Sequence, residues 1–146
     1  MKVTKFTDKG APDIAAVVQS CFARVARTKA KLPISYNACL SYITRQAQLG
    51  NAFLVSGYLV VVEPQVPYFS TSMVLVEMCV VRYKEEQVAC ISDVPRFLLA
   101  EAKRRGLRFV VAGDSLSGVM TKVYLSTPGY EPLGQTVAGD LACAGD

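Results

Sequence analysis

The middle of the chain carries the pattern that most restricts its fold. Residues 73–81 are apolar at every position except Glu77, and a polar segment over residues 82–92 follows. A helical pattern then covers residues 94–105 and ends at a glycine, after which residues 107–112 form a second β-type run. A strand, a loop, a helix and a strand within about 40 residues predict a βαβ unit with two parallel strands, and such units are almost always right-handed.

The polar segment of this unit occupies a position that favours ligands. Its first strand is apolar at nearly every position, so we expect a central strand that is covered on both faces. Ligands of open α/β sheets bind near the carboxyl ends of the strands. Residues 82–92 lie at that end and lead into a helix N-terminus, where backbone N–H groups favour anions.

Length and composition indicate one folded domain. The chain has 146 residues, of which 51% are hydrophobic, and this apolar content is too high for a disordered chain. We expect a single domain over residues 1–138 and a loose tail over residues 139–146. The apolar runs are too short for a transmembrane helix. Residues 1–5 carry no hydrophobic signal region, so we expect a cytoplasmic protein.

The sequence contains no histidine. This excludes Ser–His and Cys–His nucleophilic machinery and removes the commonest metal ligand, so acid–base chemistry must use carboxylates, tyrosine, lysine or water. The cysteines form an odd set without metal-type spacing, namely Cys21, Cys39, Cys79, Cys90 and Cys143. We interpret them as buried free thiols in a reducing cytoplasm, and we predict no metal site.

The net charge of +4 arises from 16 basic and 12 acidic residues and is mild. Basic residues cluster twice, as Arg24, Arg27, Lys29 and Lys31 and as Lys103, Arg104, Arg105 and Arg108. The second cluster complements the dipole at a helix C-terminus, whereas the first is suited to an acidic partner or to cofactor phosphates. Neither cluster belongs to a recognised nucleic-acid-binding motif, so we do not expect nucleic-acid binding.

The N-terminal part of the chain predicts one strand and two helices. A short strand covers residues 3–6, and an amphipathic helix follows Pro12. Ser35 is a candidate cap for a second helix, which ends near residue 49.

Ser56 and Gly57 interrupt a strand-like stretch over residues 52–62. A tight hairpin through these two residues is one interpretation, and a single long strand with a bulge at Gly57 is the other. We expect a loop over residues 64–70, because its two prolines exclude a β-ladder. The two aromatic residues of this loop are either exposed or folded back onto the core.

The C-terminal third predicts a helix and further β segments. Ser115 is a candidate N-cap for a helix whose apolar residues recur at helical spacing, and Pro128 with Gly129 ends this helix. Residues 130–133 and 135–138 predict the final β segments. The element order is therefore β-α-α-β-β-β-α-β-α-β, which predicts a mixed α/β fold with one central parallel βαβ unit.

This order and several local sequences resemble the GNAT (GCN5-related N-acetyltransferase) superfamily across nearly the whole chain. Residues 77–81 resemble the fourth strand of that family, and residues 107–112 resemble its fifth strand. Residues 123–132 resemble its tyrosine-bearing fourth helix and the segment that follows. The resemblance implies an acetyltransferase that uses acetyl-CoA, in the style of divergent, small phage-encoded members.

The resemblance also implies where the cofactor binds. In the family, acetyl-CoA lies between splayed fourth and fifth strands, and its pyrophosphate binds a loop of pattern Gln/Arg-x-x-Gly-x-Gly/Ala. The same spacing occurs here with a cysteine and a serine in place of the two glycines. The implied cofactor-binding residues are Cys79, Val80, Val81, Gln87, Val88, Ala89, Cys90, Ile91 and Ser92. Side chains at the glycine positions hinder close backbone approach, so they lower the expected affinity for CoA.

The chemistry that the resemblance implies is direct transfer, in which an amine attacks a thioester carbonyl polarised by a backbone N–H of the fourth strand. Glu77 is then the candidate base, because a carboxylate inside an apolar strand is desolvated and its pKa rises. Pairing of Glu77 with a basic residue is the alternative. Tyr124 is the candidate acid that protonates the departing thiolate, and it also fits its helix as a core residue.

Other functions remain open. One is a GNAT-shaped protein without catalysis that binds and modulates another protein, for example a phage protein that acts on a host enzyme. The changed loop and the aromatic pair Tyr68 and Phe69 favour it. Another is a CoA- or nucleotide-binding regulator. For an active enzyme, we expect a small-molecule or protein amine that enters over the first two helices and the loop with Tyr68 and Phe69. An exposed last strand could pair with a second copy to form a homodimer.

Overall fold

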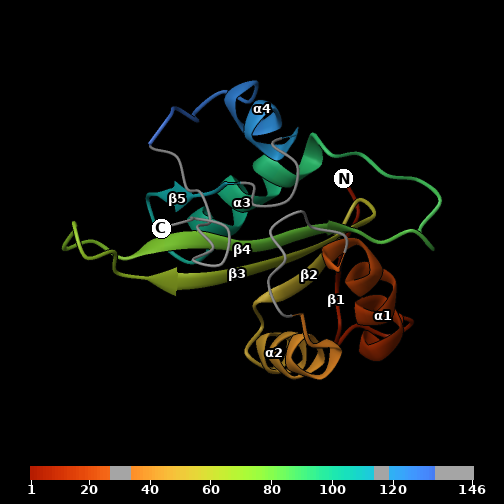
Figure 1. Cartoon of the computed structure of the whole chain (residues 1–146). Helices are drawn as coiled ribbons and strands as arrows, with labels where there is room; N and C mark the ends of the chain where they lie inside the picture. The colour runs from red at the N-terminus through yellow and green to blue at the C-terminus, as the bar shows by residue number, and fades with distance from the viewer. Residues whose placement is uncertain (27–33, 114–118, 134–146) are drawn as a thin grey trace, which may run out of the picture.

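Five strands form one mixed sheet in the computed structural model, which describes residues 1–26, 34–113 and 119–133. The elements in chain order are β1 (Val3–Lys5), α1 (Ile14–Val25), α2 (Tyr36–Gln48), β2 (Ala52–Val55), β3 (Tyr58–Gln65), β4 (Val74–Arg82), α3 (Asp93–Arg104), β5 (Val110–Val111) and α4 (Val119–Leu125). Neighbouring strands are antiparallel except β4 and β5, which are parallel and are joined through α3 (Figure 1). The predicted mixed α/β fold with one parallel crossover is confirmed.

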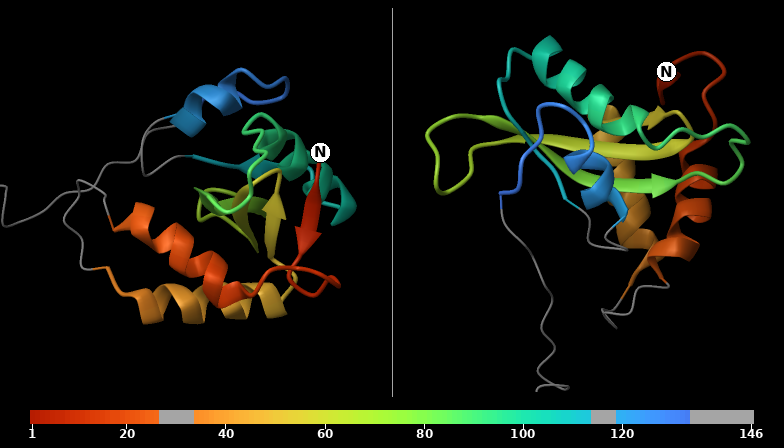
Figure 2. Two further views of the ribbon diagram at one scale, coloured as in Figure 1. Left: turned by 90° about the vertical axis from the view of Figure 1, so that its right-hand side faces the viewer. Right: turned by 90° about the horizontal axis from the view of Figure 1, so that it is seen from above.

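Helices cover both faces of the sheet (Figure 2). Successive strand residues point to opposite faces, so β2 and β3 carry two apolar sets. Phe53, Val55, Val60 and Val62 pack with α3 and α4, whereas Ala52, Leu54, Leu59 and Val61 pack with α1 and α2. Because both sets are buried, β2 and β3 form the centre of the fold.

Ser56 and Gly57 form the turn between β2 and β3. Both have positive φ, 44° at Ser56 and 83° at Gly57, and a two-residue turn of this kind is of type I′. The hairpin interpretation is therefore confirmed, and the single bulged strand is wrong. A Cβ at Gly57 would lie 2.9 Å from the Cβ of Ala89 and 3.0 Å from the carbonyl oxygen of Val88. The turn thus packs directly against the loop that precedes α3.

The predicted capping residues are found at the start of α2 and after the end of α3. The Ser35 hydroxyl accepts a hydrogen bond from the N–H of Ala38 at 3.2 Å and caps α2. α3 ends at Arg104, and Gly106 follows its cap residue with a φ of 73°. The N–H of Leu107 donates to the carbonyl oxygen of Ala102 at 2.8 Å. This is the Schellman arrangement that a glycine after a helix favours.

The predicted loop after β3 begins too early in the chain. β3 runs through Pro64 to Gln65, and both residues pair with β4. β2 begins at Ala52, which pairs with Val61, so β2 has no residue opposite this part of β3. Among the described residues, β4 is therefore its only ladder neighbour there. One side of the strand needs no N–H donor there, so a proline is tolerated.

β5 is shorter than predicted. It contains Val110 and Val111, whereas the sequence predicts a strand over residues 107–112. Residues 130–133, predicted as a strand, do not join the sheet, because a two-residue β5 offers little edge for a further strand. Ser115, Cys143, the loop after α1 with Arg27, Lys29 and Lys31, the segment 135–138 and the predicted tail lie outside the described residues.

Candidate active site

β4 and β5 pair only at their upstream ends. The parallel ladder joins Leu75 to Val110 and Val76 to Val111, while β4 continues well beyond these pairs. From Glu77 onward β4 keeps its ladder to β3 but, within the described residues, has none to β5. β4 therefore extends beyond the end of β5 at its carboxyl end, where ligands of such sheets bind.

Met78 forms a β-bulge in β4, just after the ladder between β4 and β5 ends at Val76. Val62 pairs with Glu77 and Val61 pairs with Cys79, so Met78 has no partner in β3. Residues that pair across strands share a face, so Glu77 and Cys79 lie on opposite faces of the sheet although they are two positions apart. Met78 is 42% exposed, so the expectation of a strand covered on both faces is wrong at its centre.

Glu77 lies between β4 and the chain that leaves β5. It is half-buried, and its Oε2 accepts a hydrogen bond from the N–H of Gly113 at 3.4 Å. Its pairing with Val62 places it on the face covered by α3 and α4. The carboxylate therefore contacts the main chain just after β5 ends.

Tyr124 packs in the apolar core between α3 and α4, with 4% of its surface exposed. Its ring centroid lies 5.2 Å from that of Tyr130, whose hydroxyl donates to the carbonyl oxygen of Pro95 at 2.8 Å. Burial and then the charge of Glu77 raise the pKa of Tyr130. The structure thus brings Glu77 and Tyr124 to one face of the sheet, with Tyr130 near both. The sequence analysis missed Tyr130 because it assigned this residue to a strand.

The cysteine thiols near the site are poor nucleophiles. Burial, followed by the charge of Glu77, raises the pKa of Cys79 to about 12. Burial also raises the pKa of Cys21 to about 12, so both thiols stay protonated near neutral pH. Among the described cysteines, which are all free thiols, Cys21 is buried, Cys39 and Cys79 are half-buried and Cys90 is exposed. The expectation of burial is therefore wrong for Cys90.

Residues 87–92 form the largely exposed loop that leads into α3. The N–H of Cys90 donates to the carbonyl oxygen of Ser56 at 3.0 Å, whereas the N–H groups of Ile91 and Ser92 make no hydrogen bond within the described chain. Ser92 has a φ of −68°, and Ser56 is the one described non-glycine residue with a positive φ. The loop therefore holds its conformation without the two family glycines.

Arg82 ties the start of this loop to the β2–β3 turn. Its guanidinium donates to the carbonyl oxygen of Gly57 at 2.7 Å and to the carbonyl oxygens of Tyr83 and Glu86. The same group lies over the ring of Tyr58, 5.7 Å from the centroid. The Arg82 side chain thus connects the end of β4 and the residues before the loop to the β2–β3 turn.

Asp93 places a carboxylate in the first turn of α3. Its Oδ2 accepts a hydrogen bond from the Ser56 hydroxyl at 2.6 Å, and its Oδ1 pairs with Arg96 at 3.0 Å. The bond from Ser56 lowers the pKa of Asp93. A phosphate here would meet the amides of Ile91 and Ser92 and the charge of Arg96, but also the opposing charge of Asp93. Sequence analysis missed this contact, since Ser56 and Asp93 lie 37 positions apart.

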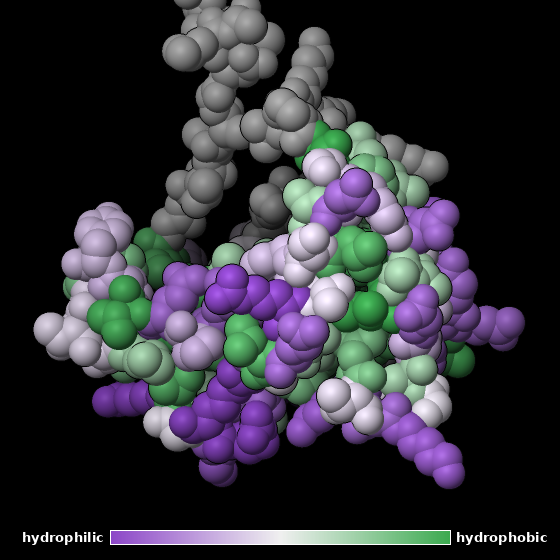
Figure 3. All heavy atoms as spheres, turned by 90° about the horizontal axis from the view of Figure 1, so that it is seen from below, coloured by the Kyte–Doolittle hydropathy of each residue, from purple (hydrophilic) through white to green (hydrophobic). Residues whose placement is uncertain are grey.

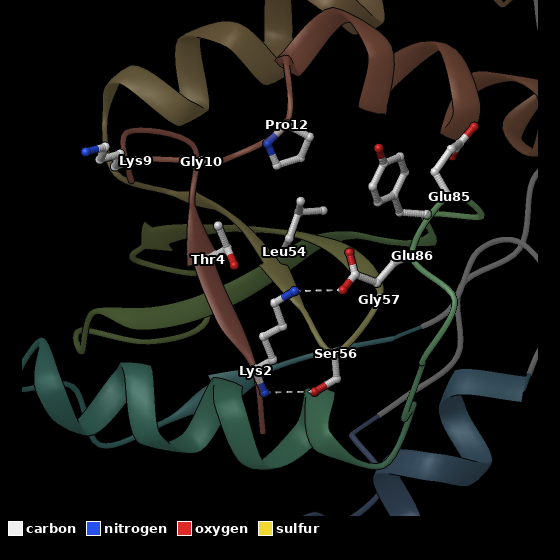
Figure 4. Close-up of a pocket in the computed structure, with 11 residues that line it drawn as sticks. Lys2, Thr4, Lys9, Gly10, Pro12, Leu54, Ser56, Gly57, Glu85 and Glu86 are labelled. Atoms are coloured by element: carbon white, nitrogen blue, oxygen red, sulfur yellow. Dashed lines mark hydrogen bonds and ion pairs between the residues drawn. The ribbon is translucent and has the colours of Figure 1, made fainter.

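A polar cavity of about 400 Å³ lies beside β1 and the β2–β3 turn. Lys2 and Glu86 form an ion pair at 2.9 Å on its wall, and the backbone N–H of Lys2 contacts the Ser56 hydroxyl at 3.4 Å (Figure 4). None of the predicted site residues lines this cavity. It is therefore separate from Glu77 and Tyr124.

Tyr68 and Phe69 lie at the tip of the β3–β4 hairpin, away from Glu77 and Tyr124. Tyr68 is 100% exposed and Phe69 is 61% exposed, and their rings meet edge to face with centroids 5.2 Å apart. The interpretation with exposed aromatic residues is confirmed. Val66 and Met73 are also exposed in this segment. Figure 3 shows hydrophobic and hydrophilic residues interspersed over the face of the molecule seen from below.

No group of three or more His, Cys, Asp or Glu side chains in the described part of the chain could hold a metal ion. No helix in the same residues is long and apolar enough to cross a membrane.

A mixed five-stranded sheet with α3 as the crossover between its two parallel strands matches the fold of solved GNAT-type acetyltransferases. This chain has that fold, as the sequence resemblance implied. An acetyltransferase-type protein from Pyrococcus furiosus matches it with a TM-score of 0.63 and 14% identity, over 96% of this chain and 99% of that chain.

Two further solved structures share the fold. A predicted acetyltransferase with acetyl-CoA from Clostridium acetobutylicum has a TM-score of 0.57 at 11% identity, over 90% of this chain and 94% of that chain. The aminoglycoside 6′-N-acetyltransferase of Acinetobacter haemolyticus has a TM-score of 0.57 at 10% identity, over 96% and 97% of the two chains. At such identities the likeness is one of fold. No protein-family model and no curated protein matches the sequence.

Proposed function

We propose that this protein transfers an acetyl group from acetyl-CoA to an amine by direct attack. The observation that carries the proposal is the extension of β4 past its two-residue ladder to β5, beside the Met78 bulge, which leaves main-chain groups of β4 without a β5 partner in the described chain. Solved proteins of the same fold include one with acetyl-CoA and one that acetylates an aminoglycoside amine. They support the reaction class for a chain that has no histidine.

The residues of β4 supply the donor side of the proposed site. We assign the backbone of Cys79, Val80 and Val81 to the pantetheine arm, with an N–H of this segment polarising the thioester carbonyl. The acetyl thioester provides the carbon that the amine attacks. Because the nearby thiols stay protonated, an acetyl-cysteine intermediate is not part of the proposal.

Glu77 and Tyr124 divide the proton transfers in this proposal. The amine nitrogen forms a bond to the acetyl carbon, and Glu77 accepts the proton that the nitrogen loses. The carbon–sulfur bond breaks, and the hydroxyl of Tyr124 gives its proton to the departing thiolate. Tyr130 positions the ring of Tyr124 through their contact and is itself fixed by its bond to Pro95.

Residues 87–92 offer the phosphates of the cofactor fewer favourable contacts than the glycine loop of the family. The amides of Ile91 and Ser92 and the guanidinium of Arg96 favour an anion, whereas the Cys90 amide is occupied and the carboxylate of Asp93 repels one. The residues present therefore fit a diphosphate, with opposing charge beside it. We expect binding no tighter than micromolar, about −8 kcal/mol.

Calorimetric titration with acetyl-CoA tests the proposal. We expect saturable heat at micromolar to millimolar concentrations, and a Tyr124→Phe variant that binds the cofactor equally but transfers acetyl groups about 100-fold more slowly. If no heat and no thermal shift appear at millimolar acetyl-CoA, the enzyme proposal is wrong. If turnover is unchanged in Tyr124→Phe, this tyrosine has only a packing role.

The alternative is a non-catalytic protein that modulates another protein, and a pull-down experiment tests it. Its specific support is the exposed aromatic pair Tyr68 and Phe69. That alternative requires a partner that the double variant Tyr68→Ala, Phe69→Ala no longer captures in a pull-down. If the double variant still captures every partner, the hairpin tip does not bind them.

A further inference from the structure

Beside the bulge, on the face opposite Glu77, Glu63 presents a second carboxylate. Glu63 pairs with Val76 of β4, and its neighbour Val62 faces α3 and α4, so Glu63 faces α1 and α2. Its Oε1 accepts from the Gln46 amide at 2.9 Å, and its Oε2 accepts from the Gln65 amide at 3.1 Å. Both oxygens are thus oriented by uncharged donors.

Gln65 links this carboxylate to the bulge. Its amide nitrogen, which donates to Glu63, also lies 3.6 Å from the sulfur of Met78. No lysine or arginine in the described part of the chain forms an ion pair with Glu63. A half-buried carboxylate that is held in place but not neutralised stands next to the proposed point of attack.

Tyr42 provides the second observation. Its hydroxyl on α2 is buried and has no hydrogen-bond partner within the described residues. Burial, then the charge of Glu63, then Cys79, and a polar side-chain contact with Glu63 raise the pKa of Tyr42 to about 12, so the hydroxyl is directed at the Glu63 carboxylate. A buried hydroxyl without a partner costs about 1–3 kcal/mol, so in proteins it usually meets a ligand or an ordered water.

We propose that Glu63 and Tyr42 bind a positively charged, non-reacting amino group of the acceptor, so that diamines and polyamines are the preferred acceptors. An ammonium group has three donors and no acceptor. It can donate to Glu63 and to the Tyr42 oxygen while Gln46 and Gln65 keep their bonds to the carboxylate. The inference rests on the proposed acetyl transfer, since it assigns the acceptor class of that site.

The position of Glu63 explains why the bound ammonium is not the reacting one. Glu63 lies on β3, roughly 5 Å to the side of β4, whereas attack takes place at the β4 main chain beside Met78. A short aliphatic spacer between two amino groups spans this separation. The reacting amine then lies near the bulge while its distant partner stays with Glu63.

Putrescine, a four-carbon diamine, and butane-1,4-diol, its matched analogue with hydroxyls in place of both amino groups, are the binding probes, and aminobutanol, which keeps one amino group, is the probe for transfer. In calorimetric titrations without acetyl-CoA, we expect wild-type protein to bind putrescine about tenfold more tightly than butane-1,4-diol. Glu63→Gln should remove this preference, and Glu85→Gln, at an exposed carboxylate beyond the other end of β4, should leave it intact. Equal binding of putrescine and butane-1,4-diol by wild-type protein would overturn the inference, as would a preference that survives in Glu63→Gln.

Tyr42→Phe separates a ligand role from a structural one. We expect this variant to bind putrescine several-fold more weakly while its Tm stays equal or rises, because the hydroxyl has no partner in the described chain. A fall of several degrees in Tm with unchanged putrescine affinity would contradict the assignment.

Steady-state kinetics with acetyl-CoA then separates the two proposals. For putrescine as acceptor, Glu63→Gln should raise KM about tenfold and change kcat little. If putrescine binds through Glu63 but acetyl-CoA does not bind, the acetyltransferase proposal fails and the amine site stands. If transfer occurs to aminobutanol as fast as to putrescine, the amine site fails alone.

Discussion

Hydrogen bonds to three separate segments meet at Ser56. Its N–H donates to Lys2 at 2.8 Å, its carbonyl oxygen accepts from Cys90 at 3.0 Å, and its hydroxyl donates to Asp93 at 2.6 Å. Its φ of 44° costs a non-glycine residue about 1–2 kcal/mol. The bonds to three separate segments offset this strain. One serine in a turn therefore positions β1, the loop before α3 and the start of α3.

The neighbouring Gly57 allows a matched test of this packing. Gly57→Ala places a Cβ 2.9 Å from Ala89 and 3.0 Å from the Val88 carbonyl oxygen, whereas Gly10→Ala, at a nearly equal φ of 82°, meets nothing within 4 Å. Both variants bear the left-handed strain of about 1–2 kcal/mol, and Gly57→Ala adds overpacking of about 1–3 kcal/mol. Urea unfolding should therefore rank Gly57→Ala clearly below Gly10→Ala. Equal losses would show that the turn does not press on the loop.

Asp93 sets the charge that a cofactor phosphate would meet. Asp93→Asn removes this charge and keeps an oxygen that can accept from Ser56. We expect acetyl-CoA to bind this variant about three- to tenfold more tightly than wild type, as measured by calorimetry at low salt. Glu85→Gln is the control for a general change in net charge. Unchanged affinity in Asp93→Asn would mean that the phosphates do not lie at the N-terminus of α3.

At the scale of elements, the features that the sequence predicts are those with local causes. Ser35 before α2 and Gly106 after α3 define helix ends through bonds to near neighbours. The β2–β3 hairpin follows from Ser56 and Gly57 in the same way. These signals lie within a few residues of the structure that they produce, so one sequence is enough to read them.

The bulge at Met78 shows what a sequence pattern does not reveal. Residues 73–81 are apolar almost throughout, so an extra residue leaves no break in the pattern. The extension of β3 through Pro64 and the short β5 depend on where neighbouring strands end. The contacts of Glu63 and of Ser56 with Asp93 join distant segments. Glu77 and Tyr124, in contrast, were predicted from a family resemblance, and the structure places them on one face.

The loop before α3 depends on one side chain of β4. Arg82→Lys keeps the charge, but an ammonium cannot donate in the planar fork that reaches Gly57, Tyr83 and Glu86. We expect amide hydrogen exchange to rise at least tenfold at the hydrogen-bonded amides of Tyr83, Glu86 and Cys90 and to stay constant in α2. A uniform rise over the whole chain would instead indicate a global loss of stability.

Across the whole molecule, a polar network joins the two layers. Glu101 of α3 is 6% exposed and pairs with Arg104 and with Arg105, the latter at 2.9 Å. Arg105 also donates to Asn51 at 2.8 Å, and Asn51 donates to Gln46 of α2 at 3.0 Å. The network therefore connects the end of α3 with the turn between α2 and β2.

This network makes stability depend on pH. Burial opposes ionisation of Glu101, but the hydrogen bonds and charges of Arg104 and Arg105 outweigh burial and hold the pKa of Glu101 below its usual value of 4.5. The unfolded chain therefore binds the proton first, so this stabilisation is present above pH 4.5 and is lost as pH falls through the folded pKa.

Glu101→Gln tests this dependence. At pH 7 the variant should be about 2 kcal/mol less stable than wild type, because two arginines lose their partner. As pH falls below 4.5, the difference between the two proteins should shrink, while Glu85→Gln should track wild type throughout. Urea unfolding over a pH series measures both trends, and a constant difference would contradict the role of Glu101.

The anchoring of the loop by the β2–β3 turn has a consequence for how the phosphate site responds to substitution. Ser56, Gly57 and Arg82 hold this part of the chain, and Cys90 and Ser92 have no positive φ, so neither position needs a glycine to keep the loop conformation. Cys90→Gly and Ser92→Gly would therefore change access to the backbone amides and leave the path of the loop as it is.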